Sequence, residues 1–129
     1  MNDRPAEVGD LRLATIVVNA LDMDRAAEFW SATLGYQRPG SIGADDQFAK
    51  LVDPLGRGPS VLVQRAKEIP AEPAPVHIDL YTAERDQHIE RLVKLGATRV
   101  DDWSYPDHHD FVVLRDPEGN EFCVIAVDS

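Results

Sequence analysis

Short apolar runs and longer helical stripes follow one another along the chain, in an order that occurs twice. The β-branched run Leu11–Asn19 predicts a buried strand. Apolar residues then recur at helical spacing between Asp22, a suitable N-cap, and Gly35, a suitable C-terminal glycine. Further strands are predicted at residues 36–38, 47–52 and 61–65. The first part of the chain therefore predicts a strand, a helix and three strands.

The same order returns after a proline-rich stretch at residues 66–75, which we interpret as a linker. Residues 76–81 alternate apolar and polar side chains, as a half-buried strand should. Thr82 is a suitable N-cap for a second helix, and Gly96 suits its C-terminal end. Three more strands are predicted at residues 98–101, 110–115 and 121–127.

Two landmarks recur in the same order at nearly the same spacing. Leu-Gly at residues 34–35 returns at 95–96, and Asp-Pro-Leu-Gly at residues 53–56 returns as Asp-Pro-Glu-Gly at 116–119. We interpret the second Asp-Pro turn as structural, because its residue types suit a tight turn. The pattern predicts an α+β fold in one domain, residues 1–129, with two tandem βαβββ modules at 11–65 and 76–127. Each module is too small to bury its sheet alone, so the two must pack together.

Charge and composition narrow the range of partners. Thirteen basic against 23 acidic residues give a net charge of −10, which repels nucleic-acid phosphates and anionic membrane surfaces. No apolar run approaches the roughly 20 residues that span a bilayer. The first ten residues lack the apolar core of a signal peptide, and the lone Cys123 cannot form an intrachain disulfide. We therefore expect a cytoplasmic protein that binds neither nucleic acid nor membrane.

Two stretches resemble the glyoxalase-like proteins of the vicinal oxygen chelate superfamily. HIDLYTAERDQHIERLVKLGATRV, followed by FVVLRDPEGNEFCVI, is similar to the second half of these proteins, and DMDRAAEFWSATLGY resembles their first helix. The DPEGNEFCV ending resembles one glyoxalase-like subgroup common in actinobacteria. The resemblance covers residues 11–127 and implies paired modules whose sheets curl around a cup-shaped cavity. Members include glyoxalase I, extradiol dioxygenases, fosfomycin-modifying enzymes, methylmalonyl-CoA epimerase and bleomycin-binding resistance proteins.

Enzymes of this superfamily typically hold a divalent metal with four side chains, two from each module. The resemblance matches these positions to Thr15, Gln64, His77 and Cys123, where an enzyme would offer mostly His and Glu. A threonine hydroxyl and a glutamine amide are weak ligands, and a Cys–His pair falls short of the three protein ligands of catalytic zinc sites. We therefore expect no metal cofactor; a divalent metal, if bound, would use His77, Gln64 and Cys123.

Period-two alternation places His77, Asp79 and Tyr81 on one face of their strand, with Ile78 and Leu80 facing the helices. A polar face inside a curled sheet indicates a cavity lining, because buried polar groups need partners. His77 is therefore the candidate catalytic acid or base. The alternative is a hydrogen-bonded set that only holds the sheet in shape.

The remaining candidates are aromatic residues and a thiol. Phe48, Trp103 and Tyr105 are expected at the rim of the cup, since aromatic walls with a few polar groups are typical of small-molecule pockets. Cys123 is either a small buried hydrophobe or a pocket thiol, and His109 is expected in a solvated loop. The predicted ligand-binding set is Thr15, Phe48, Gln64, His77, Asp79, Tyr81, Trp103 and Cys123.

Two classes of function are consistent with these residues. The first is a metal-free protein that binds a small aromatic or amphipathic molecule in its cup, as bleomycin-binding relatives bind a drug. The alternative is a divalent-metal-dependent lyase, isomerase or dioxygenase, and metal-free acid–base catalysis through His77 is a third possibility. The resemblance also implies a homodimer whose modules complete the cups across subunits, although a monomer that closes its own cup remains an alternative.

Overall fold

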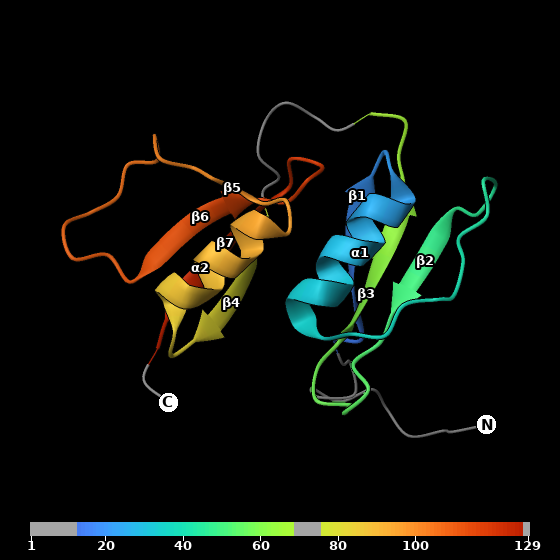
Figure 1. Ribbon diagram of the computed structural model, residues 1–129, viewed down its shortest axis with the longest axis horizontal. Helices are drawn as coiled ribbons and strands as arrows, with labels where there is room; N and C mark the ends of the chain where they lie inside the picture. Colours follow the sequence, from blue (N-terminus) through green and yellow to red (C-terminus); the bar gives the residue numbers. More distant parts are fainter. Residues whose placement is uncertain (1–12, 69–75, 128–129) are drawn as a thin grey trace, which may run out of the picture.

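The computed structural model describes residues 13–68 and 76–127, which form two helices and two small mixed sheets (Figure 1). The first module contains β1 (Thr15–Ala20), α1 (Met23–Leu34), β2 (Phe48–Leu51) and β3 (Ser60–Arg65). The second module contains β4 (Ile78–Thr82), α2 (Arg85–Lys94), β5 (Thr98–Arg99), β6 (Phe111–Arg115) and β7 (Glu121–Ala126). The predicted α+β class is confirmed.

Each sheet joins its first and last strands in parallel. The first sheet has the order β1-β3-β2 and the second the order β4-β7-β6-β5, with β1 parallel to β3 and β4 parallel to β7. The strand predicted at residues 36–38 is reduced to one bridge between Gln37 and Val52. Leu11, Arg12 and most of the predicted linker, residues 69–75, lie outside the described residues.

The helix ends follow local chemistry, with one exception. Asp22 caps α1 through its side chain, and Gly35 ends that helix with a φ of 72°. Gly96 follows α2 with a φ of 119°. The prediction of Thr82 as the second N-cap is wrong, because α2 begins after Glu84. The Thr82 hydroxyl instead accepts a hydrogen bond from the Glu84 backbone N–H, a turn that threonine forms as readily as a cap.

Of two hydrophobic clusters among the described residues, the larger joins the two modules and includes the buried side of α1. One side of α1 packs on the first sheet, whereas Phe29 and Trp30 meet Phe122 of β7 edge-on, with ring centroids 6.0 and 5.1 Å apart. The Trp30 indole N–H donates a buried hydrogen bond of 3.0 Å to Asp116. Helix α1 therefore lies between the first sheet and β7, while Asn120 of the second module reaches the end of β1 by donating a hydrogen bond to the Asn19 backbone carbonyl.

The repeated Asp-Pro turns share one hydrogen-bonding pattern. Asp53 accepts hydrogen bonds from the backbone N–H groups of Leu55 and Arg57, at 2.9 and 3.0 Å. The Leu55 N–H, above all, holds the pKa of Asp53 below its ordinary value. Asp116 receives the same two bonds from the residues two and four positions further on. In each turn, the aspartate carboxylate thus accepts hydrogen bonds from backbone N–H groups that have no partner in the sheet.

The second of these turns also holds the modules together. Glu118 is buried, and its carboxylate accepts hydrogen bonds of 3.0 Å from the backbone N–H groups of Leu21 and Asp22, just before α1. Arg25 donates a third, at 2.8 Å. A carboxylate at this position is favoured by the unpaired N–H groups and positive dipole of a helix N-terminus.

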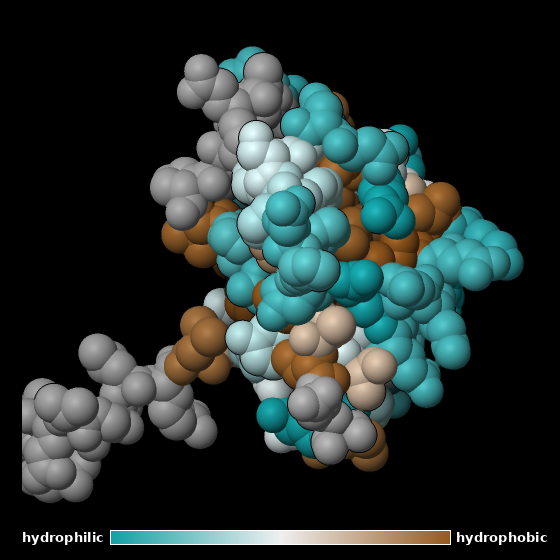
Figure 2. All heavy atoms as spheres, turned by 90° about the vertical axis from the view of Figure 1, so that its left-hand side faces the viewer, coloured by the Kyte–Doolittle hydropathy of each residue, from teal (hydrophilic) through white to brown (hydrophobic). Residues whose placement is uncertain are grey.

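Two properties of the surface bear on possible partners. Among the described residues, the two helices are too short and too polar to cross a membrane. The side of the molecule shown in Figure 2 is largely hydrophilic, and its apolar side chains occur in small separate groups.

Candidate functional site

The face of the first sheet that points away from α1 carries the first set of candidate residues. This face, the first outer face, contains Thr15, Val17, Phe48, Leu62 and Gln64, while the alternating positions of the strands are buried against α1. Val17 is 50% exposed and Phe48 56%. The first outer face is thus a partly exposed surface that combines the apolar Val17, Phe48 and Leu62 with polar residues, among them the exposed Lys50, which pairs with Leu62.

The register of the strands separates the two first-module residues that the resemblance implies as metal ligands. Thr15 pairs with Ser60, and their hydroxyl oxygens lie 2.8 Å apart, whereas Gln64 pairs with Asn19. Gln64 therefore lies four residues, or about 13 Å along the strand, from the partner of Thr15. The two side chains do not converge on one ion.

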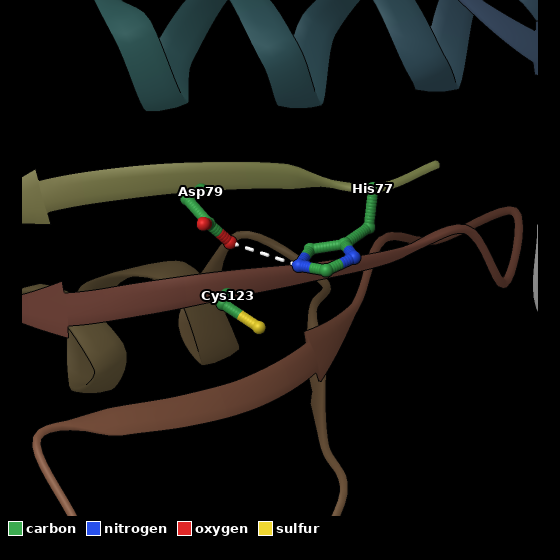
Figure 3. A group of neighbouring side chains, drawn as sticks. All are labelled: His77, Asp79 and Cys123. Atoms are coloured by element: carbon green, nitrogen blue, oxygen red, sulfur yellow. Dashed lines mark ion pairs between the residues drawn. The ribbon is translucent and has the colours of Figure 1, made fainter. Parts of the chain in front are cut away.

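The second outer face, on the side of the second sheet away from α2, carries the other candidates. Asp79 and Tyr81 are exposed there, while Ile78 and Leu80 pack against the shared core. The predicted alternation along this strand is confirmed. His77 lies just before β4 and points the same way as Asp79 (Figure 3).

Three of the predicted residues lie close together on this second outer face. Asp79 is the direct register partner of Cys123, and His77 Nε2 lies 3.0 Å from Asp79 Oδ1. One potential ligand atom from each of the three residues lies within 4.8 Å of the other two (Figure 3). The histidine and aspartate are half-exposed and the thiol is buried beneath them. The three side chains thus form a small polar cluster that solvent can reach.

Burial governs the chemistry of the thiol. Burial, with a smaller contribution from the negative charge of Asp79, raises the pKa of Cys123 to about 11. The thiol therefore stays protonated at neutral pH and is a poor nucleophile in the metal-free protein. This agrees with the expectation of a small buried side chain.

The two modules differ where their register makes them equivalent. In the first module, Val17 faces Leu62 across the parallel pair β1–β3; in the second, Asp79 faces Cys123 across β4–β7. The first module thus presents two apolar side chains where the second presents a carboxylate and a thiol. Leu62, and not Gln64, is the structural counterpart of Cys123.

The four-ligand metal set implied by the resemblance does not fit this chain. Thr15 and Gln64 lie apart on the first outer face, and α1 lies between that sheet and the strand that carries Cys123. Neither first-module residue offers an imidazole or a carboxylate. Of these four positions, only the two in the second module offer an imidazole or a thiol, while Thr15 and Gln64 offer a neutral hydroxyl and a neutral amide.

The segment between β5 and β6, beside the second outer face, contains both Trp103 and Tyr105. Trp103, predicted at the rim, is partly exposed in the segment between β5 and β6. In the same segment Tyr105 stacks on His109, with ring centroids 4.6 Å apart, and its hydroxyl bonds the backbone of Val100 and Val113. His109, expected in a solvated loop, is therefore half-buried against a fixed tyrosine. The local sequence gives no signal for this contact, because it depends on how the loop folds back.

A comparison with protein families shows to which family this chain belongs. The model of the glyoxalase-like domain matches residues 15–125. The chain belongs to this family. The predicted resemblance to the superfamily of glyoxalases, bleomycin resistance proteins and dioxygenases is thereby confirmed. Among curated proteins, none matches the sequence of this glyoxalase-like domain.

Solved structures share the fold at low sequence identity. A mutant of the fosfomycin resistance protein FosX from Listeria monocytogenes, complexed with Mn(II) and 1S,2S-dihydroxypropylphosphonic acid, is 16% identical, with a TM-score of 0.67 over 95% of this chain and 93% of its own. A glyoxalase/bleomycin resistance protein/dioxygenase superfamily member from Sphaerobacter thermophilus is 21% identical, with a TM-score of 0.63 over 89% and 96%. A possible glyoxalase from Bacillus cereus is 20% identical, with a TM-score of 0.62 over 89% and 98%. At these identities, the likeness shows the fold alone.

Proposed function

We propose that this glyoxalase-like domain binds a small aromatic or amphipathic molecule between a first outer face and a second outer face. The observation that carries the proposal is the contrast between Val17 and Leu62 in the first module and Asp79 and Cys123 at the equivalent positions of the second. An apolar wall opposite a few fixed polar groups is the usual construction of a small-molecule site. Such a ligand is held by the lining, without the four-ligand metal centre implied by the resemblance.

We further propose that two copies of the chain complete each cup. Helix α1 keeps the two outer faces of one chain apart, and Val17, Phe48 and Tyr81 remain exposed on them. In a symmetric dimer, the first outer face of one copy meets the second outer face of the other, so the dimer contains two identical cups. This arrangement covers apolar sheet surface that one chain leaves open.

A cytoplasmic location agrees with the chemistry of the chain. The single cysteine is a free thiol, which a reducing compartment preserves. The net charge of −10 makes a neutral or cationic small molecule a better partner than a nucleic acid.

The cluster of His77, Asp79 and Cys123 supports the alternative of a metal-dependent lyase, isomerase or dioxygenase. Metal-free acid–base catalysis through His77 is a separate alternative, because its Nε2 lies 3.0 Å from Asp79 and its ring is half-exposed. Replacing His77 with Ala would then abolish turnover and leave organic-ligand binding largely intact.

The binding proposal can be tested with N-phenyl-1-naphthylamine, an uncharged aromatic dye, and metal-free protein. We expect saturable fluorescence enhancement in the wild type and at least tenfold weaker binding in Val17→Arg, which places a charge on the first outer face. Val93→Arg is the matched control, because Val93 on α2 is 46% exposed, close to the 50% of Val17. Absence of binding, or equal loss in the two variants, would contradict a ligand site on the first outer face.

A further inference from the structure

We propose that a cleft between the two helices binds a small organic carboxylate, at a site separate from the cup. The cleft lies between α2, the last turn of α1 and the open edge of β4, which is the edge that points away from β7 (Figure 1). Its volume is about 320 Å³, at the lower end of the roughly 300–1,000 Å³ that small-molecule sites enclose. Two of its three walls are helices, which belong to neither outer face.

The open edge of β4 brings backbone groups to the cleft. The Thr82 carbonyl accepts a hydrogen bond of 2.9 Å from the Val127 N–H, so Thr82 and, by alternation, Leu80 direct their backbone groups to β7. The backbone N–H and C=O groups of Asp79 and Tyr81 consequently point to the open edge, and both residues line the cleft. Among the described residues, no strand pairs with this edge. Backbone N–H donors are therefore available to a ligand there.

The last turn of α1 contributes a buried hydroxyl without a partner. Thr33 lines the cleft and is only 9% exposed. In the part of the chain that the structure describes, its Oγ1 is the one buried side-chain nitrogen or oxygen that makes no hydrogen bond. An unpaired buried hydroxyl costs free energy, and a helical threonine usually avoids that cost by bonding to a carbonyl of the preceding turn. A ligand oxygen in the cleft satisfies this hydroxyl.

Arg91 on α2 brings a positive charge to the cleft. Its guanidinium donates hydrogen bonds of 3.1 Å to the Ala32 and Thr33 carbonyls, in the last turn of α1, which has no basic residue of its own. These contacts fix the guanidinium but leave its charge without a counter-ion. Arg85 and Lys94 of the same helix each pair with a carboxylate, whereas Arg91 forms no ion pair with any described residue.

The groups around the cleft favour an anion with an apolar body. His88 Nδ1 accepts from Arg91, at 3.3 and 3.4 Å, so in the neutral ring the proton lies on Nε2 and that nitrogen is a donor as well. Leu34 and Leu92 supply apolar lining. The net charge of −10 opposes anions at long range, but salt screens such effects beyond about 8 Å. Within the cleft, a carboxylate therefore meets a fixed cation and several donors.

The test is a nuclear magnetic resonance titration of ¹⁵N-labelled full-length protein with hexanoate, and with hexanamide as an uncharged analogue of the same shape. We expect hexanoate to shift the backbone amide signals of Thr33, Tyr81 and Arg91, and to bind about tenfold more tightly than hexanamide. Thr33→Val removes the hydroxyl at nearly constant shape and should weaken hexanoate binding about fivefold. The same change should not lower the melting temperature, because the hydroxyl has no partner in the free protein.

A matched pair of arginine variants tests the role of the charge. Arg91→Gln should reduce the affinity for hexanoate to that for hexanamide. Arg85→Gln makes the same charge change on α2 outside the cleft and should leave the affinity within about twofold, since exposed charges contribute little. Circular dichroism checks the fold, and if Arg91→Gln does not fold, Thr33→Val and the comparison with hexanamide still decide.

Four outcomes would overturn the carboxylate site. They are absence of hexanoate binding, equal affinity for hexanoate and hexanamide, equal loss of binding in the two arginine variants, and unchanged binding in Thr33→Val. Signal shifts confined to Val17 and Phe48 would also overturn it, because they would place hexanoate on the first outer face. Failure of this titration is thus distinguishable from failure of the dye-binding experiment.

Discussion

Cys123 illustrates how position on a strand determines the chemistry of one side chain. Its neighbours across the sheet are Val113 on one side and Asp79 on the other, so the thiol lies between an apolar surface and a carboxylate. Both surroundings disfavour a thiolate, because burial removes water and the carboxylate adds a like charge. A bound cation would offset the negative charge of Asp79 and so favour the thiolate. The ionisation of Cys123 therefore reflects the charges around it.

The first prediction concerns alkylation of Cys123 by iodoacetamide in metal-free protein, followed by mass spectrometry. With a pKa of about 11, only about one thiol in a thousand is ionised at pH 8. The rate should therefore rise about tenfold per pH unit up to about pH 10, whereas an ordinary thiol levels off above about 8.5. Asp79→Asn removes the like charge and should speed the reaction at pH 8. A plateau near pH 8.5 in the folded protein would contradict the assignment, and urea-unfolded protein provides the reference.

At the scale of single elements, local patterns could predict what local interactions determine. The N-cap at Asp22, the glycine at Gly35 and the alternation along β4 each depend on residues close in sequence, and the structure confirms them. The prediction at Thr82 is wrong because a threonine forms a turn or a cap with the same residue types nearby.

Strand register could not be predicted in the same way. The pairing of Val17 with Leu62 joins residues far apart in the chain, and a shift of two residues preserves the inside–outside pattern of the strand. Sequence patterns therefore offer no reason to prefer Leu62 over Gln64 as the counterpart of Cys123. Likewise, alternation places Asp79 beside His77, but its position opposite Cys123 emerges only from the paired strands.

The second Asp-Pro turn yields a prediction about stability. Glu118→Gln removes a buried charge that accepts hydrogen bonds from Leu21, Asp22 and Arg25, and it turns an amide N–H toward backbone donors. We expect a loss of about 1–3 kcal/mol in the free energy of unfolding, measured by urea denaturation.

The matched control is Glu90→Gln on α2. Glu90 pairs with Lys94 at 3.5 Å, and both side chains are largely exposed. A surface pair of this kind contributes little, so the change should stay within about 0.5 kcal/mol. Equal effects of the two substitutions would show that the Glu118 contacts do not stabilise the joined modules.

For the whole molecule, the decisive feature is that the two modules pack through their helix sides. Trp30 and Phe29 of α1 meet Phe122 in the second module, and Glu118 reaches back to the start of α1. The same packing that buries the shared core leaves Val17 and Phe48 on the first outer face, and Tyr81 on the second, exposed to solvent or to a partner. The position of α1 between the modules thus stabilises one chain and also leaves its sheet faces available to a second chain.

The last prediction tests whether the cup is shared between chains. Val17→Arg alters the first outer face and Tyr81→Arg the second, and each variant alone should bind the naphthalene dye poorly. When the two are unfolded, mixed equally and refolded together, a mixed dimer contains one cup with both changes and one cup with neither. About one quarter of all cups should then regain wild-type affinity. A cup closed within one chain always contains one of the two changes, so a mixture without recovery, or a monomer by light scattering, would contradict the shared cup.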